Sequence, residues 1–87
     1  MYTVYIIYSL SIDRYYVGYT NDLIRRFNEH NRKKGKFTDQ GIPWKLVHQE
    51  DFELKSDAMN REKFIKAQKS RKFILSLISS LDSRHSV

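Results

Sequence analysis

The sequence predicts a single domain of the α+β class, and three observations support this prediction. Residues 2–10 and 15–20 are rich in β-branched and aromatic side chains and are separated by a short polar segment, which is typical of a β-hairpin. Residues 22–32 and 73–81 instead carry apolar side chains at helical spacing. A chain of 87 residues has room for one hydrophobic core, so we expect these elements to share it.

The first strand, residues 2–10, has apolar side chains on both faces, which indicates a central position in a sheet. If the polar segment 11–14 forms the loop, Ser9 pairs with Tyr16, and the side chains of Tyr5 and Tyr16 lie on one face. A register shifted by one residue would place these two tyrosines on opposite faces. The tyrosine cluster is therefore predicted on condition that the loop has this length.

The helix predicted over residues 22–32 places two polar side chains beside the hairpin. Leu23 and Phe27, four residues apart, form its apolar stripe, and Arg26 and His30 lie at the edge of that stripe. A cation that can bind phosphate and an imidazole that can transfer protons are thus expected next to a strand that carries tyrosines.

A third strand is predicted over residues 44–52, where Trp44, Leu46 and His48 alternate with more polar residues. This pattern places the three side chains on one face and suits an edge strand, because the other face carries charge. We expect Trp44 to anchor the strand in the core.

The final helices are predicted to follow this strand directly, the first from about residue 56 to residue 67 and the second over residues 73–81. The domain is therefore expected to span residues 1–81. Residues 82–87 have nothing to bury, so we expect them to form a frayed tail.

One carboxylate lies at an unexpected position of the penultimate helix. On a helical projection, Glu62 falls inside the apolar stripe that contains Ala58 and Ile65. Burying an ionised carboxylate without a partner costs several kcal/mol. Glu62 is therefore expected to bind a metal ion, to lie in a wet cleft, or to form a structural ion pair with a cation such as Lys66 or Arg26.

The charge of the chain indicates a polyanionic partner. The formal net charge is +6 and the pI is about 9.7, which favours nucleic acid. Six basic residues lie within residues 61–72, and four of them are candidates for phosphate contacts: Lys63, Lys66, Lys69 and Lys72. The alternative is that this run is an ordinary solvated surface.

Two absences in the sequence bear on where the protein acts. The chain has no cysteine, which excludes disulfide, zinc-thiolate and thiol-nucleophile chemistry. It also lacks an apolar run of about 18 residues and a signal-peptide pattern. We therefore expect a cytoplasmic protein with no membrane association.

Five elements of the sequence, taken in order, resemble the GIY-YIG nuclease domain. They are Val4-Tyr5, Tyr16-Val17-Gly18, Arg26, His30, and Glu62 preceded by Ala58. The resemblance extends from residue 2 to about residue 78. Within the superfamily the chain is most similar to a poorly characterised group of small, stand-alone bacterial proteins, and it also resembles the nuclease domain of structure-specific endonuclease subunits.

The resemblance implies a fold and a site. The fold is a three-stranded antiparallel sheet with the first strand in the centre, flanked by three helices. The site consists of Tyr5, Tyr16, Arg26, His30 and Glu62. One divalent metal ion, Mg²⁺ or Mn²⁺, is implied on the glutamate.

Phosphodiester hydrolysis requires these residue types. It needs an activated water, a Lewis acid and a cation that stabilises the charge of the transition state. Arg26 is a permanently charged fork for phosphate oxygens, and Glu62 suffices as the protein ligand of a Mg²⁺ ion that keeps most of its waters. Tyr5 or Tyr16 is the candidate base, and the sequence leaves the choice open. His30 is expected to orient a tyrosine or to contact phosphate.

The sequence therefore predicts a metal-dependent endonuclease that hydrolyses DNA, rather than RNA, in repair or recombination. The alternative is a nucleic-acid-binding module with little or no catalysis that acts with a protein partner. Many family members carry an asparagine on the helix after the metal-binding glutamate, and none follows Glu62 here. This departure favours the alternative.

Overall fold

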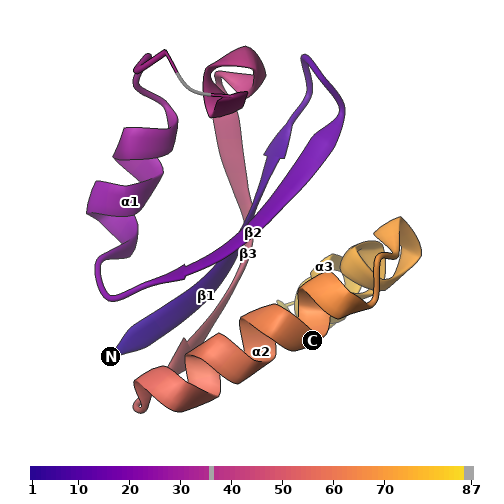
Figure 1. The fold of residues 1–87 in the computed structure, drawn as a ribbon. Helices are drawn as coiled ribbons and strands as arrows, with labels where there is room; N and C mark the ends of the chain where they lie inside the picture. The colour runs from indigo at the N-terminus through magenta and orange to yellow at the C-terminus, as the bar shows by residue number, and fades with distance from the viewer. Residues whose placement is uncertain (36, 86–87) are drawn as a thin grey trace.

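A three-stranded antiparallel sheet forms the centre of the molecule in the computed structural model, which describes residues 1–35 and 37–85, with side chains up to residue 79 (Figure 1). The elements follow in the order β1 (Tyr2–Ser9), β2 (Arg14–Thr20), α1 (Leu23–His30), the 3₁₀-helix η1 (Phe37–Gly41), β3 (Trp44–Phe52), α2 (Lys55–Ala67) and α3 (Arg71–His85). The strand order is β2-β1-β3. The predicted α+β fold with a central first strand is confirmed.

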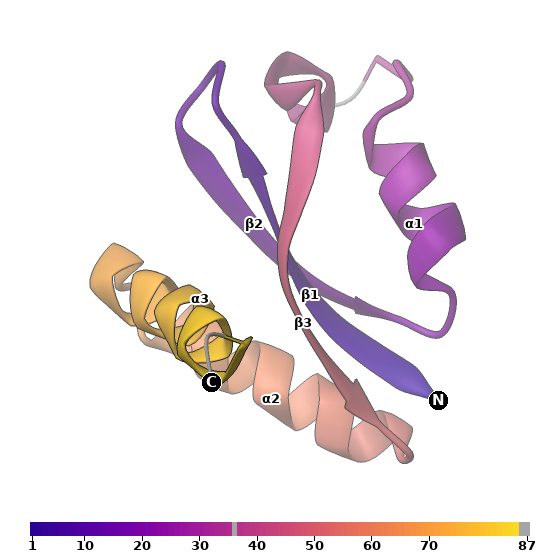
Figure 2. The ribbon, with the colours of Figure 1, turned by 180° about the vertical axis from the view of Figure 1, so that it is seen from behind.

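Helices cover both faces of the sheet, with α1 on one side and α2 and α3 on the other (Figures 1 and 2). Successive side chains of a strand point to opposite faces, so β1 contributes to both layers of the core. The α2-side cluster contains the buried residues Val4, Ile6, Val17, Ala58 and Ile65, with Phe73, Ile74 and Leu77 of α3 packed against it. The α1-side cluster contains Tyr5, Ile7 and Trp44, with Tyr16, Leu23, Phe27 and Ile42 among the side chains packed against it.

The hairpin has a different register from the predicted one. Ser9 pairs with Arg14 and Ile7 pairs with Tyr16, so the strand pairing is shifted by two residues and the loop, residues 10–13, begins one residue earlier than predicted. Asp13 in this loop has a φ of 52° and accepts a hydrogen bond of 2.6 Å from the Tyr8 hydroxyl. Because side chains along a strand repeat every two residues, a shift of two residues leaves the tyrosines on their predicted common face.

A β-bulge in β3 overturns the prediction that Trp44, Leu46 and His48 share one face. Leu46 pairs with Ile7 and His48 pairs with Ile6, so β3 has one residue more than β1 at this point. As a result, Trp44 belongs to the α1-side cluster as the predicted core anchor, whereas the side chain of His48 lies toward α2.

The helix ends differ from the predicted ones at α1 and α3. α1 ends two residues earlier than predicted, because Asn31 leaves the helix to bind the first residue of β3. Its side chain accepts a hydrogen bond of 2.5 Å from the backbone nitrogen of Trp44 and donates one of 3.0 Å to the carbonyl oxygen of Trp44. The backbone of α3 continues to His85, four residues beyond the predicted end.

Part of the predicted tail lies outside the description. Residues 86–87, and the side chains from residue 80 onward, are not described. Fraying of residues 82–87 and the domain limit at residue 81 stay predictions. None of the helices in the described part of the chain has the length and apolar character that crossing a lipid bilayer requires.

Replacing Asn31 with alanine should destabilise the fold, because two backbone groups of Trp44 lose their partner. We expect the free energy of unfolding to fall by roughly 1–3 kcal/mol, measured by urea denaturation. Asn28→Ala is the matched control, since Asn28 is exposed on the same helix. Equal losses in the two variants would show that Asn31 does not link α1 to β3.

Candidate active site

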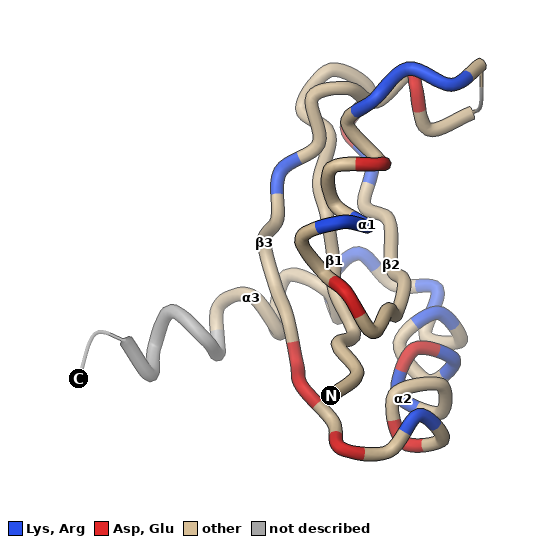
Figure 3. The backbone as a smooth tube through the Cα atoms, turned by 90° about the vertical axis from the view of Figure 1, so that its left-hand side faces the viewer, with Lys and Arg blue, Asp and Glu red and all other residues tan. Residues whose placement is uncertain are grey.

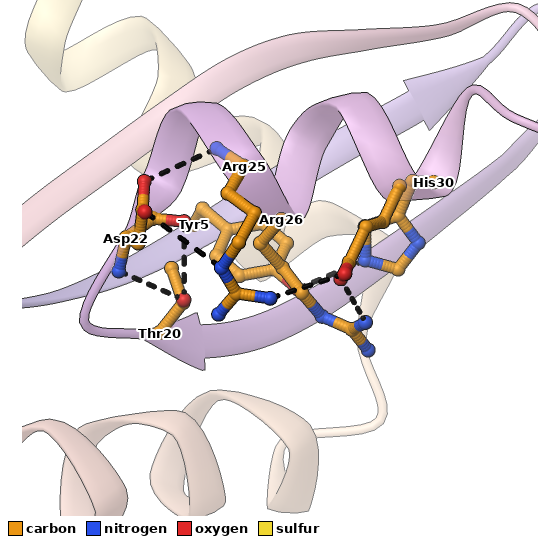
Figure 4. Close-up of polar contacts among 7 residues, drawn as sticks. Tyr5, Thr20, Asp22, Arg25, Arg26 and His30 are labelled. Atoms are coloured by element: carbon orange, nitrogen blue, oxygen red, sulfur yellow. Dashed lines mark hydrogen bonds and ion pairs between the residues drawn. The ribbon is translucent and has the colours of Figure 1, made fainter.

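Four of the five predicted site residues meet on the α1 side of the sheet. Tyr5 comes from β1, and Arg26 and His30 come from α1 (Figure 4). Tyr16 comes from β2. The ring centroids of Tyr16 and His30 are 4.8 Å apart, and those of Tyr5 and Tyr16 are 6.5 Å apart. A pocket of about 280 Å³ opens here, lined by Tyr16, Arg26, Glu29, His30, Lys34, Phe37 and Thr38.

Tyr5 is buried beside two residues of this pocket, Tyr16 and His30, and is 1 % exposed. Its hydroxyl is 2.9 Å from Nε2 of His30. A Cβ atom added at Gly18 would lie 2.5 Å from the same hydroxyl oxygen, so the glycine is required here for close approach. Burial raises the pKa of Tyr5 to about 12, although hydrogen bonding from Arg26 works in the opposite direction.

His30 is an uncharged member of the site at neutral pH. It is 4 % exposed, and burial lowers its pKa to about 4, with the positive charges of Arg26 and Lys34 contributing in the same direction. The hydrogen bond between Tyr5 and His30 therefore joins a protonated phenol to a neutral imidazole. Each satisfies the other's buried polar group. Whether His30 orients a tyrosine in a reaction or contacts phosphate stays a prediction.

Arg26 brings positive charge to the pocket. Together with Arg25 it pairs with the carboxylate of Glu29, a residue that sequence reasoning missed. Nη1 of Arg26 is 3.0 Å from Oε1 of Glu29, and Nη1 of Arg25 is 3.1 Å from Oε2 of the same residue. Hydrogen bonding from Arg26 lowers the pKa of Glu29. The spacing of three and four residues between these side chains was the signal in the sequence that could have found the pair.

Glu62 does not line this pocket. It lies on α2, on the far side of the sheet from α1, and its side chain is 16 % exposed. Its Oε1 atom is 3.6 Å from Nζ of Lys66, so the alternative of an ion pair with Lys66 is present in the structure. Glu62 influences Tyr5 through its charge, which adds to the rise in the pKa of Tyr5.

The donor set of the described residues suits only a weakly ligated metal ion. Among the described side chains, those of residues 1–35 and 37–79, no group of three or more His, Asp or Glu could hold a metal ion together. A zinc-type site, which needs three or four protein ligands, does not fit. Mg²⁺ or Mn²⁺ does, because such ions bind through one or two carboxylates, waters and substrate phosphates, and Glu62 is a partly exposed carboxylate.

The four candidate lysines are all exposed and lie within ten consecutive residues of the chain. Lys63 and Lys66 lie on α2, Lys69 lies between the two helices, and Lys72 lies on α3. Figure 3 shows basic residues in blue along α2 and also in the segment that follows α1. The chain thus presents positive charge on both sides of the sheet.

Sequence reasoning also missed a polar network on the α2 side, which involves His48, a residue without an expected role. Nε2 of His48 is 2.7 Å from Glu50, and Arg61 of α2 donates to Glu50 at 2.8 Å and 3.2 Å. Burial alone would raise the pKa of Glu50, but the hydrogen bonds from Arg61 and His48 lower it. The network connects α2 to β3, and therefore fixes the helix that carries Glu62.

Comparison with known proteins places this site in a family. The chain matches the GIY-YIG catalytic domain over residues 1–74, which is most of its length, and it therefore belongs to that family. The resemblance inferred from the sequence is confirmed.

The relatives are small UPF0213 proteins. One from Halobacterium salinarum is 48 % identical over 67 residues, an alignment that covers 76 % of this chain and 86 % of that protein. YsiG of Lactococcus lactis is 46 % identical over 66 residues, covering 75 % and 64 %. The solution NMR structure of a UPF0213 protein from Bacillus halodurans has a TM-score of 0.57 at 30 % identity, covering 91 % of this chain and 84 % of that chain.

Gly18→Ala should displace the Tyr5 hydroxyl, since the new methyl group and that oxygen cannot occupy the same space. We expect a loss of roughly 1–3 kcal/mol in unfolding free energy, which is typical of overpacking. The double variant Gly18→Ala/Tyr5→Phe should recover part of the loss, because the clashing oxygen is removed. Chemical denaturation of both variants checks this, and an unchanged Gly18→Ala protein would contradict the close contact.

His30 should make stability depend on pH. The pKa of His30 is lower in the folded state than the unfolded value of 6.5. The stability that neutral His30 contributes to the fold is therefore present above pH 6.5 and is lost as the pH falls toward 4. We expect the wild type to lose on the order of 2 kcal/mol more than His30→Gln over this range. Urea denaturation at several pH values measures the difference in stability between the two proteins. The titration of the carboxylates, which both proteins contain, cancels in this difference. Parallel pH profiles would show that His30 is not buried in its neutral form.

Proposed function

We propose that this protein is a metal-dependent endonuclease that hydrolyses the phosphodiester bonds of DNA. The observation that carries the proposal is the pocket in which Tyr16, Arg26 and a neutral His30 meet, in a chain that belongs to the GIY-YIG family. A positive fork beside hydroxyl and imidazole groups suits a phosphate ester, whose transition state gathers negative charge on its oxygens.

Arg26 is the residue we assign to the scissile phosphate. Nη1 of Arg26 is bound to Glu29 and Arg26 also hydrogen-bonds to Tyr5, so the remaining guanidinium N–H groups can donate to non-bridging oxygens. Lys34 at the same pocket adds a second positive charge for the flanking backbone. Together these two cationic side chains would hold the phosphate before and during the reaction.

Tyr16 is the tyrosine we assign to the attacking water. Tyr5 is unsuited, because it is 1 % exposed, its pKa is raised to about 12, and its hydroxyl is bound to His30. Tyr16 instead lines the pocket next to Arg26. The pair of Tyr5 and His30 then serves to position Tyr16, whose ring packs against the imidazole.

Glu62 is the residue that would hold a divalent ion. When bound, Mg²⁺ or Mn²⁺ would supply Lewis-acid chemistry. Glu62 does not line the pocket, but its charge reaches Tyr5, which packs beside the pocket residues Tyr16 and His30. The carboxylate is partly exposed, and its pair with Lys66 at 3.6 Å is long, so an ion can compete for it. The exposed lysines of α2 and α3 would contact the DNA backbone. We place the activity in the cytoplasm, in repair or recombination, with a protein partner that directs it to its substrate.

A second candidate function is a nucleic-acid-binding module without catalysis. The observation that favours it is that both key charges already have partners, Arg26 in Glu29 and Glu62 in Lys66. In that case the basic surface would bind DNA, and divalent ions would have no effect. The two candidates differ in what the removal of either charge does to cleavage.

Arg26→Ala and Glu62→Gln should each lower cleavage about 100-fold or more, since the first removes a cation that stabilises the transition state and the second removes the carboxylate that would hold the metal ion. The assay is nicking of supercoiled and branched DNA in Mg²⁺ or Mn²⁺. Arg25→Ala and Glu53→Gln are matched controls, because Arg25 shares Glu29 without lining the pocket and Glu53 is exposed.

Stability separates the two roles of Glu62. Its pair with an exposed lysine is worth about 0–1 kcal/mol, so Glu62→Gln should stay folded and nearly as stable as the wild type. A loss of several kcal/mol, together with a wild type that no divalent ion activates, would identify Glu62 as half of a structural ion pair. The endonuclease proposal would then fail at this residue.

A further inference from the structure

An exposed phenylalanine forms part of the pocket wall. Phe37 is the first residue of η1 and is 69 % exposed. It lines the same pocket as Tyr16, Arg26 and Lys34, yet within the described part of the chain it belongs to neither hydrophobic cluster. A single exposed apolar side chain needs no explanation on an open surface. In the wall of a cationic pocket, however, an aromatic ring is a recognition group for a ligand with an apolar face.

The backbone around Phe37 is held in place from both sides. On the N-terminal side, the carboxylate of Asp39 accepts hydrogen bonds of 2.9 Å and 2.6 Å from the backbone nitrogens of Lys34 and Gly35. On the C-terminal side, the indole nitrogen of Trp44 donates to the carbonyl oxygen of Thr38 at 2.8 Å. The ring is therefore presented to solvent on a fixed support, which limits the entropy that binding costs.

The pocket combines two kinds of recognition at once. Arg26 and Lys34 attract an anion, and Phe37 offers a flat apolar surface within the same pocket. A nucleotide has this combination, with a charged phosphate and a flat base. We propose that Phe37 stacks on a nucleobase next to the phosphate held by Arg26, so that the substrate is nucleic acid that is unpaired at this position.

The preference for an unpaired base follows from geometry. In a duplex both faces of a base are covered by its neighbours, so a protein ring can stack on it only after the base leaves the helix. In a single strand the face of each base is available, and stacking on an aromatic side chain is worth about 1–3 kcal/mol per base. This inference rests on the proposed function for the phosphate contact and adds the substrate class.

The test measures the affinity of the protein for short single-stranded and duplex oligonucleotides of one sequence, by fluorescence polarisation without divalent ions. Phe37→Ala should weaken single-strand binding about 5- to 150-fold and change duplex binding less than about twofold. Phe37→Trp should retain the affinity, and its new indole should be quenched when the base stacks. Ile24→Ala is the matched control, because Ile24 is 76 % exposed on α1 and does not line the pocket.

Lys34→Ala separates charge from stacking. It should weaken both single-strand and duplex binding and reduce their salt dependence, because it removes a charge rather than a flat surface. Single strands of DNA and of RNA form the two arms of each titration, which shows which of them the site takes.

The outcomes separate the two proposals. If Phe37→Ala weakens single-strand and duplex binding equally, or weakens neither, the stacking inference is overturned, while cleavage that depends on Arg26 would leave the endonuclease proposal standing. If Phe37→Ala acts only on single strands but the wild type cleaves nothing, stacking holds and catalysis fails. A wild type that binds no single strand overturns the inference directly.

Discussion

The contact of the Tyr5 hydroxyl with His30 above Gly18 is the interaction on which the site depends. A buried hydroxyl and a buried imidazole each cost free energy without a partner, and each provides the partner of the other. The missing side chain at Gly18 leaves the space that the hydroxyl occupies. The contact therefore fixes β1, β2 and the end of α1 relative to one another. Arg26 lies one turn before His30 on α1, so its position at the pocket follows from the same contact.

The part of the fold that depends on side-chain periodicity could be predicted from the sequence. The hairpin loop was placed one residue too late, which shifts the strand pairing by two residues, yet Tyr5 and Tyr16 still share a face, because a pairing error of two residues preserves the alternation of a strand. The bulge between the pairs of Ile6 and Ile7 changes the alternation by one residue, and it sends His48 to the opposite face from Trp44. A bulge leaves little trace in a pattern of apolar residues, so neither the faces of β3 nor the network around Glu50 could be foreseen.

The carboxylates of the site show where prediction from the sequence ends. Helical projection correctly indicated that Glu62 is largely shielded from solvent, since its side chain is 16 % exposed. A projection gives the direction of a side chain around its own helix, but it does not say which element faces that helix. Glu62 consequently turned out to lie on α2, outside the pocket of Tyr16 and Arg26. Its roles in metal binding and catalysis stay predictions, because its charge reaches Tyr5 while its nearest ion-pair partner is Lys66.

The ion pairs of α1 would allow Arg26 to bind a phosphate without leaving Glu29 unpaired. The carboxylate of Glu29 forms ion pairs with two arginines, with Arg26 at Oε1 and with Arg25 at Oε2. A phosphate that draws Arg26 away from Glu29 would leave the carboxylate still paired with Arg25, so no charge is left without a partner. Pairs on a partly exposed helix are worth about 0–1 kcal/mol, and phosphate binds guanidinium through two parallel hydrogen bonds that are stronger. The exchange therefore costs little. Under the proposed function, Glu29 would hold Arg26 at the pocket until a phosphate replaces it.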